Sequence, residues 1–207
     1  MTAERISASD VAHWIRGRAD PEQRYLFGVA GAPGSGKSTL AAALADELGA
    51  VVVPMDGFHL PNATLDERGL RGVKGAPETF SADAFVAAVR RLAADDTDVD
   101  LPGFDRVLDE PQPDRVRVRV SDLVVIVEGN YLLLDTEPWG QLRELFDAVA
   151  HLDVDPALRV ERLVNRHVRF GMTSGQASAF VHRSDEPNAA RVEAVSHRAH
   201  LIIEGAP

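Results

Sequence analysis

The stretch that decides the fold reads Gly31-Ala32-Pro33-Gly34-Ser35-Gly36-Lys37-Ser38-Thr39 and matches the phosphate-binding loop pattern G-x-x-x-x-G-K-[ST]. An apolar run at residues 26–30 precedes it, and an Ala/Leu-rich stretch at residues 39–48 follows it. A strand before the loop and a helix after it are the context in which such a match is meaningful. The alternative is a Gly-rich turn before an ordinary helix. The flanking pattern favours the phosphate-binding loop, or P-loop.

Each residue type in the loop suits a nucleotide phosphate chain. Glycines let the backbone wrap closely, so that N–H groups point at the phosphates, and the following helix adds its positive N-terminal end. We expect Lys37 to reach the β- and γ-phosphates of ATP and the Ser38 hydroxyl to hold Mg²⁺. The chain has twenty arginines but only two lysines, Lys37 and Lys74. A lysine at this position fits a compact point charge on phosphate.

Five apolar stretches alternate with helical patterns along the chain, at residues 26–30, 51–54, 123–127, 149–154 and 201–203. This order predicts an α/β fold of the P-loop NTPase kind, with a five-stranded parallel sheet, helices on both faces and the P-loop strand at the centre. We expect one domain over residues 1–207.

Three further segments complete this expectation. Residues 57–80 and 102–114 are predicted to be long irregular loops, which in compact domains are usually functional. Arginine and valine alternate over residues 115–120, which predicts a half-solvated edge strand.

Two carboxylates directly follow predicted strands. Asp56 comes after residues 51–54 and Glu128 after residues 123–127. Ligands of parallel α/β sheets bind beyond the carboxyl ends of the strands, so both side chains should lie near Lys37. Glu128 is then a candidate partner of Mg²⁺, and Asp56 a candidate acceptor of a hydroxyl proton. The alternatives are a turn cap for Glu128 and an Asx turn for Asp56.

An arginine-rich segment follows the fourth predicted strand. Arg162, Arg166 and Arg169 have the i, i+4, i+7 spacing of one helix face. They are either a solvated face or part of a small helical lid, over about residues 156–183, whose guanidiniums neutralise a transferring phosphoryl group. The sequence leaves both interpretations open.

Composition narrows the classes of function. A formal charge of −10 argues against a nucleic-acid or membrane-binding surface, and the longest apolar runs are too short to span a bilayer. The chain has no cysteine, which excludes disulfides, thiolate catalysis and Cys-ligated zinc. We therefore expect a cytoplasmic protein without nucleic-acid or membrane partners. Homo-oligomerisation is left open.

Several motifs resemble those of the superfamily of uridine kinases, phosphoribulokinases and bacterial type I pantothenate kinases. The most specific are Met55-Asp-Gly-Phe-His-Leu-Pro-Asn62, Arg68-Gly-Leu70, Lys74-Gly-Ala-Pro-Glu-Thr-Phe80 and Val127-Glu-Gly-Asn-Tyr-Leu132. The resemblance covers residues 26–203. It implies ATP-dependent phosphorylation of a small metabolite's hydroxyl, with Asp56 as the base and Glu128 as the metal-linked acid. The chain is shorter than typical pantothenate kinases, and Phe104-Asp-Arg106 matches their acceptor loop only loosely. It is also similar to small bacterial nucleoside/nucleotide kinase-like members.

The leading hypothesis is a Mg·ATP-dependent kinase whose acceptor is a uridine-like nucleoside or pantothenate. A sugar or sugar acid is the alternative acceptor, and a nucleotide-dependent regulatory ATPase is the alternative of another class. The long segment after Asp56 favours a kinase, because an ATPase switch needs no enclosed acceptor pocket. The acceptor-binding candidates are His59, Arg71, Lys74, Phe104, Arg106 and Tyr131.

Overall fold

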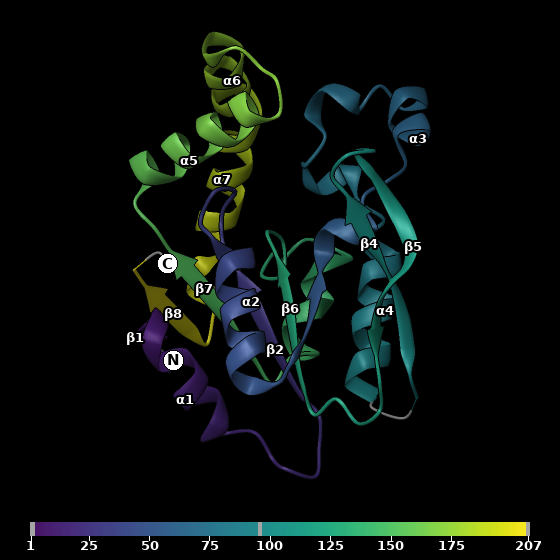
Figure 1. Cartoon of the computed structure of the whole chain (residues 1–207), viewed down its shortest axis with the longest axis vertical. Coiled ribbons are helices and arrows are strands. Elements are labelled where there is room, and N and C mark those ends of the chain that lie inside the picture. Colours follow the sequence, from purple (N-terminus) through teal and green to yellow (C-terminus); the bar gives the residue numbers. More distant parts are fainter. Residues whose placement is uncertain (1–2, 95–96, 206–207) are drawn as a thin grey trace.

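A six-stranded, wholly parallel sheet forms the centre of the computed structural model, which describes residues 3–94 and 97–205. The strand order is β1-β8-β7-β2-β6-β3 (Figure 1). The strands are β1 (Glu4–Ser7), β2 (Tyr25–Ala30), β3 (Val51–Pro54), β6 (Val124–Gly129), β7 (Ala148–Asp153) and β8 (Leu201–Glu204). The α/β fold and the five expected strands are confirmed, with the P-loop strand β2 between β7 and β6. The sixth strand, β1, was not predicted.

Apolar side chains on both faces of the strands explain the layers. Along β2, Leu26 and Ala30 belong to one core cluster, whereas Phe27 and Val29 belong to the other. This alternation is the period of a strand whose two faces are both covered. Helices α1 (Val11–Arg16) and α2 (Lys37–Leu48) contribute to the second cluster, and α4 (Ala82–Ala94) and α7 (Glu186–Ala194) contribute to the first. The expected helices on both faces are therefore present.

The remaining helices stand beyond the carboxyl ends of the sheet strands. Helices α5 (Pro156–Arg169) and α6 (Ser174–Phe180) lie on one side of this end and α3 (Asn62–Glu67) on the other (Figure 1). Single turns complete the chain: 3-10 turns at Ala8–Asp10, Met55–Phe58, Arg71–Val73, Pro77–Thr79, Trp139–Glu144 and Ser196–Arg198, and a π-helical turn at Val181–Asp185. Residues 57–80, expected to be irregular, thus contain α3 and two 3-10 turns.

Strands β4 (Val99–Asp105) and β5 (Glu110–Val118) form a separate two-stranded antiparallel hairpin. The expectation of an irregular loop over residues 102–114 is therefore wrong for most of that segment. Arg115 and Arg117 are exposed and Val118 is buried, as the alternation indicated, but the strand pairs with β4 and not with the main sheet. The hairpin packs closely on the turn after β3. A Cβ on Gly57 would lie only 2.2 Å from the Pro102 carbonyl oxygen, so only glycine fits there.

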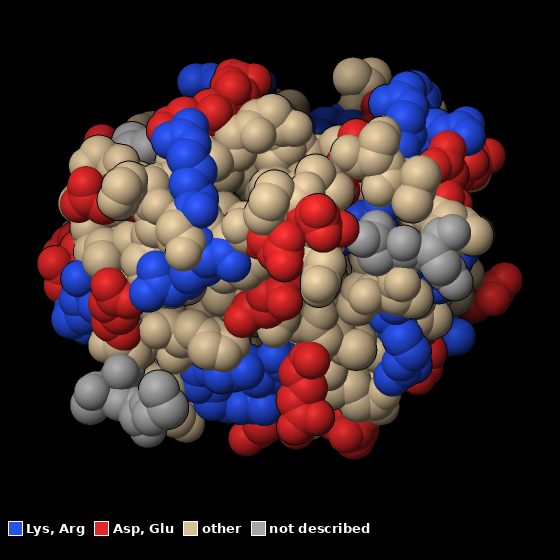
Figure 2. All heavy atoms as spheres, turned by 90° about the horizontal axis from the view of Figure 1, so that it is seen from below, with Lys and Arg blue, Asp and Glu red and all other residues tan. Residues whose placement is uncertain are grey.

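Neither sign of charge dominates the face of the molecule opposite α3 and α5. Figure 2, the view from below, shows acidic and basic side chains interspersed over that face. Within the described residues, no helix combines the length and the apolar character needed to cross a membrane.

Candidate active site

The P-loop joins β2 to α2 and is held from above by α5. Gly34 and Gly36 have positive φ angles of 79° and 92°, a conformation that favours glycine. A Cβ on Gly34 would lie 2.8 Å from the Arg159 carbonyl oxygen, so the loop and α5 meet backbone to backbone. The buried Arg159 side chain donates through Nη1 to the Pro33 carbonyl oxygen at 3.2 Å. Arg162 Nη1 donates to the Ser35 carbonyl oxygen at 3.3 Å.

Lys37, Ser38 and Glu128 meet because β2 and β6 are neighbours. The Ser38 hydroxyl donates to Glu128 Oε1 at 3.1 Å, and Glu128 is buried. Burial raises the pKa of Glu128, which the charge of Lys37 opposes. Burial likewise lowers the pKa of Lys37, which the charges of Glu128 and Asp56 oppose. An ammonium, a hydroxyl and a carboxylate thus gather at the start of α2.

Asp56 lies beside this group, in the 3-10 turn that follows β3. Strand β3 pairs with β6, and Pro54 is opposite Glu128 in the register. Asp56 Oδ2 accepts a hydrogen bond from Arg106 Nη2 at 3.0 Å. Lys37, Ser38, Asp56 and Glu128 line one cavity of about 970 Å³. The structure therefore brings together the charged groups that the strand ends predicted, while their chemical roles stay predictions.

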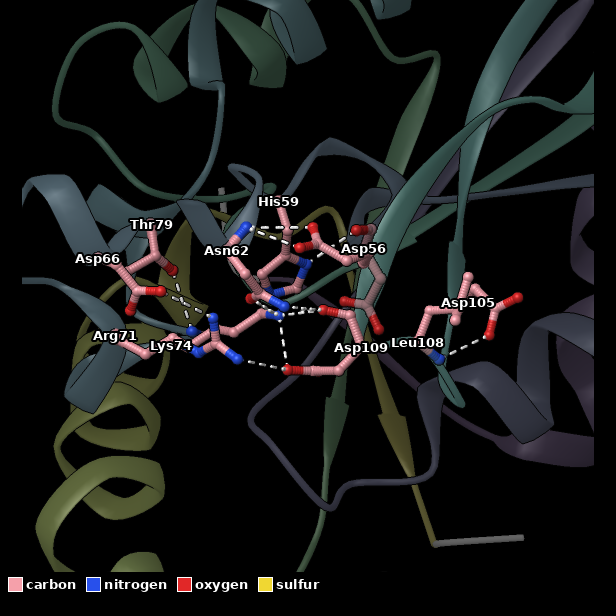
Figure 3. A network of polar contacts seen from close by, with 12 residues as sticks. Asp56, His59, Asn62, Asp66, Arg71, Lys74, Thr79, Asp105, Leu108 and Asp109 are labelled. Atoms are coloured by element: carbon pink, nitrogen blue, oxygen red, sulfur yellow. Dashed lines mark hydrogen bonds and ion pairs between the residues drawn. The ribbon is translucent and has the colours of Figure 1, made fainter. Parts of the chain in front are cut away.

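Residues 57–80 and the β4–β5 hairpin are fastened to one another (Figure 3). Lys74 Nζ contacts Asn62 Oδ1 at 2.7 Å, the Asp109 carbonyl oxygen at 2.6 Å and Asp109 Oδ2 at 2.9 Å. These three acceptors match the three hydrogens of an ammonium. Both carboxylate oxygens of Glu110 accept from the Asn62 backbone N–H at 3.1 Å. Lys74 therefore links the two segments of the cavity wall, residues 57–80 and the hairpin.

Arg71 makes weaker contacts on the same wall. Its guanidinium is 3.6 Å from Asp66 Oδ2 and 3.9 Å from Asp109 Oδ2, with a half-exposed side chain. Ion pairs at such distances and exposure contribute little to stability. Arg71 also lines the cavity, so its role as an acceptor-binding residue stays a prediction.

His59 and Phe104 form an aromatic patch of the cavity wall. The His59 ring lies 3.9 Å from the Phe80 ring and 4.9 Å from the Phe104 ring, centroid to centroid. Its Nδ1 is 2.8 Å from the Asp56 carbonyl oxygen. Burial lowers the pKa of His59, against the opposing charge of Asp56. The candidates His59 and Phe104 thus lie where an acceptor next to Asp56 could touch them.

Tyr131 lies behind this wall. The side chain is fully buried, its ring packs edge-on against Phe80 and Trp139, and its hydroxyl donates to the Gly75 carbonyl oxygen. It does not line the cavity. The expectation of direct acceptor contact is therefore not supported: Tyr131 holds Gly75 in place.

The three candidate lid arginines differ in their surroundings. Arg166 and Arg169 line the large cavity, whereas Arg162 and Arg166 line a smaller hollow of about 240 Å³ beside Gly36 and Thr39. The helical spacing predicted that the three share one helix face, and each of them lines one of these two cavities. Whether they act as a lid stays a prediction. Arg162 is also tied to the P-loop backbone, as described above.

Sequence reasoning missed two residues of α5. Arg159 belongs to the same arginine-rich stretch but lies off the i, i+4, i+7 face, and only its packing against Pro33 reveals it. His167 lines the cavity, and its Nε2 lies 2.8 Å from Oδ2 of Asp185. Asp185 is the last residue of the π-helical turn. Such turns are frequent at functional sites. No sequence signal joined His167 to a residue eighteen positions away.

Comparison with known proteins shows clear relatives. No family model matches the chain. "Uncharacterized protein YggC" of Escherichia coli K12 is 38% identical over 192 residues, covering 89% of this chain and 79% of that protein. "Putative uridine kinase C227.14" of Schizosaccharomyces pombe is 38% identical over 176 residues, covering 79% and 74%. The crystal structure of a "putative fructose transport system kinase" from Silicibacter sp. TM1040 is 39% identical, with a TM-score of 0.86 over 95% of this chain and 98% of that one.

These likenesses cover between 79% and 95% of this chain. They agree with the motif resemblance and with the geometry of Lys37, Ser38 and Glu128. The chain belongs to the P-loop kinases of the uridine kinase and phosphoribulokinase-like group.

Proposed function

We propose that this protein is a Mg·ATP-dependent kinase that transfers the γ-phosphoryl group to a hydroxyl of a small metabolite. The observation that carries the proposal is the single cavity of about 970 Å³ that Lys37, Ser38, Asp56 and Glu128 line together. Phosphoryl transfer needs mainly positioning and charge neutralisation, and this set supplies both. The glycines and the backbone N–H groups of the P-loop would surround the β- and γ-phosphates, and Lys37 would neutralise them.

The oxygen atoms at the start of α2 fit a magnesium ion. Ser38 Oγ and the Glu128 carboxylate lie 3.1 Å apart, and Mg²⁺ is usually held by one or two such groups together with substrate phosphates. Bound there, Mg²⁺ would offset the negative charge of the phosphates. Within the described residues no cluster of three or more His, Cys, Asp or Glu side chains could hold a metal. In this proposal Ser38 and Glu128 together hold the metal.

The transfer step assigns Asp56 to the acceptor. Its carboxylate takes the proton of the acceptor hydroxyl, the hydroxyl oxygen bonds to the γ-phosphorus, and the bond between that phosphorus and the β,γ-bridging oxygen breaks to release ADP. Arg106, 3.0 Å from Asp56 Oδ2, holds the carboxylate in place. Arg166 and Arg169 line the cavity from α5 and would neutralise the transferring group, with residues 156–183 as a lid.

Nucleosides and pantothenate are the first acceptors to test. The aromatic patch of His59 and Phe104 could pack against a base or an acyl chain, and the name of the S. pombe relative points to uridine. A sugar or sugar acid is the second candidate, favoured by the name of the Silicibacter protein and by the Arg71 guanidinium in the cavity wall.

ADP release measured with single candidate acceptors tests the proposal. We expect turnover that depends on both Mg²⁺ and one acceptor, with formation of the phosphorylated product seen by mass spectrometry. ATP hydrolysis at the same rate with and without every acceptor would favour the alternative, a nucleotide-dependent regulatory ATPase. That alternative does not explain why the hydrogen bonds among Asn62, Lys74 and Asp109 order the cavity wall next to Asp56.

A further inference from the structure

Arg106, in the turn of the β4–β5 hairpin, lies between the phosphate site and Asp56. Its Nη2 donates to Asp56 Oδ2 at 3.0 Å, and it lines the same cavity as Lys37. Burial lowers the pKa of Lys37, and the charge of Arg106 lowers it further. Burial raises the pKa of Glu128, and the charge of Arg106 opposes that rise. A guanidinium whose charge acts on all three groups lies where a phosphoryl group would pass from Lys37 toward Asp56.

The backbone on both sides of Arg106 is anchored, whereas its side chain is not. The Asp105 carboxylate accepts hydrogen bonds from two backbone N–H groups of the turn, at 2.9 and 3.1 Å. Beyond the turn, the Asp109 carbonyl oxygen accepts from Lys74 Nζ at 2.6 Å (Figure 3). The Arg106 side chain is more than half exposed, and within the described residues its only hydrogen-bond partner is Asp56. It can therefore change partner while the hairpin stays in place.

The pair of Arg106 and Asp56 is easily exchanged for a stronger one. Exposed ion pairs contribute little to stability, because water screens their charges. A guanidinium binds phosphate oxygens through charge-assisted, often paired hydrogen bonds, which strengthen where bound substrates exclude water. The exchange also frees the carboxylate. While the guanidinium occupies Asp56 Oδ2, this oxygen cannot take a hydroxyl hydrogen, because arginine has donors only.

We propose that Arg106 is a further catalytic residue, which leaves Asp56 Oδ2 and binds the transferring γ-phosphoryl group. This inference rests on the proposed kinase function. The freed Oδ2 takes the proton of the acceptor hydroxyl, whose oxygen bonds to the γ-phosphorus while the bond to the β,γ-bridging oxygen breaks and ADP leaves. Arg106 keeps its own protons and offsets the charge of the phosphoryl oxygens from the hairpin side, opposite Arg166 of α5 (Figure 1).

The alternative is that Arg106 only holds Asp56, and a double-mutant cycle separates the two roles. We expect Arg106→Ala to lower kcat about 10²-fold or more and to change the affinity for ADP less than about 3-fold. Combined with Asp56→Asn, it should lower kcat a further 10-fold or so, about the loss of an independent contact. No further loss in the double variant would mean that Arg106 acts only through Asp56, and overturns the inference.

Arg115 provides the matched control. It belongs to the same hairpin, its side chain is similarly exposed, and it does not line the cavity. Arg115→Ala should leave kcat and the affinity for ADP at the wild-type values. Because both arginines are exposed, both variants should fold, which their melting temperatures check. A loss of kcat in Arg115→Ala equal to that in Arg106→Ala overturns the inference, because a general effect of hairpin charge would then explain both.

A mimic of the transferring group gives a measurement that does not depend on turnover. The probe is aluminium fluoride bound together with ADP and Mg²⁺, and calorimetry compares its affinity with that of ADP alone. We expect Arg106→Ala to weaken binding of the mimic about 10- to 100-fold, because contacts made in the transition state contribute most to such binding. Arg106→Lys should recover part of this loss, since it keeps the charge without the planar fork. Equal affinity of the wild type and Arg106→Ala for the mimic overturns the inference.

Failure of this inference and failure of the proposed function give different results. If the wild type phosphorylates an acceptor and Arg106→Ala keeps its kcat, the inference is overturned and the kinase function stands. If no acceptor increases ADP release by the wild type, while Arg106→Ala still weakens binding of the mimic, the kinase function is overturned. Arg106 would then remain a residue that binds a phosphoryl group in transfer to water.

Discussion

Replacing Asp56 by Asn tests the transfer chemistry most directly. The amide keeps the size of the side chain but removes its charge and its capacity to take a proton. The bond that Asp56 Oδ2 accepts from Arg106 at 3.0 Å is partly exposed, with 32% of the Asp56 and 56% of the Arg106 side chain accessible. Such a pair contributes at most about 1 kcal/mol to stability. We therefore expect the variant to fold, with a melting temperature within a few degrees of the wild type.

The expected kinetic effect is much larger than that. A positioned general base accelerates proton transfer about 10²- to 10⁴-fold, so the barrier should rise by about 3–5 kcal/mol. Lys37, Ser38 and Glu128 remain, so binding of Mg·ATP should change little. The assay measures nucleotide affinity by calorimetry and kcat by ADP release on the same preparation.

The same change at the exposed Asp83 of α4, Asp83→Asn, is the matched control. It should leave both quantities near the wild-type values. Phosphoryl transfer by Asp56→Asn at close to the wild-type rate would refute the reasoning, because Asp56 would then be a turn residue only. Equal loss of nucleotide affinity and kcat would also refute it, because Asp56 would then belong to the nucleotide site.

Three further predictions concern the P-loop and α5. Lys37→Ala should remove transfer in a folded protein, measured as ADP release, because a charge-assisted contact to the γ-phosphate is worth several kcal/mol in the transition state. Arg166→Ala and Arg169→Ala should lower kcat more than nucleotide affinity, since their contact strengthens as charge redistributes. Gly34→Ala should abolish nucleotide binding in calorimetry, whereas Gly69→Ala, with a similar φ of 66° and open space around it, should cost only about 1 kcal/mol of stability.

Contrary outcomes are equally specific. Normal turnover in folded Lys37→Ala would remove the P-loop assignment. Unchanged kcat in both arginine variants would show that they belong to a solvated face. Equal effects of the two glycine substitutions would mean that backbone strain, and not the contact of Gly34 with the Arg159 carbonyl oxygen, limits the loop.

Much of the fold could be predicted from the sequence, because the patterns that indicate its strands and its P-loop are local. The five predicted strands are continuous apolar runs covered on both faces, and the P-loop pattern fixes the strand–loop–helix unit at residues 26–48. Parallel strands end at one edge of the sheet, so placing Asp56 and Glu128 near Lys37 needed no knowledge of the side-chain contacts.

The missed elements lack such signals. Strand β1 has the sequence Glu-Arg-Ile-Ser, in which only Ile6 is apolar, and it lies at the sheet edge. The hairpin contains Pro102, Pro111 and Pro113, which read as strand breakers. Prolines are tolerated at edges and bulges, and this two-stranded sheet has an irregularity between Leu101 and Gly103.

Which acceptor candidates have a structural role depends on partners that are far away in the sequence. The structural role of Lys74 could not be recognised from the sequence, because its partner Asp109 is 35 residues away. Tyr131 follows a strand end just as Asp56 does, yet its ring enters the core and its hydroxyl bonds to Gly75. Such roles follow from long-range packing, which residue type and spacing do not encode.

The direct contact of Gly34 with α5 has a thermodynamic consequence. A shift of α5 relative to β2 must carry the P-loop backbone with it or break the bonds of Arg159 and Arg162 to Pro33 and Ser35. An acceptor that favours one position of α5 will therefore alter the affinity for nucleotide, and nucleotide must alter the affinity for acceptor by the same factor. In the proposed kinase, ATP and the acceptor would then bind cooperatively, through a helix that need not touch both of them.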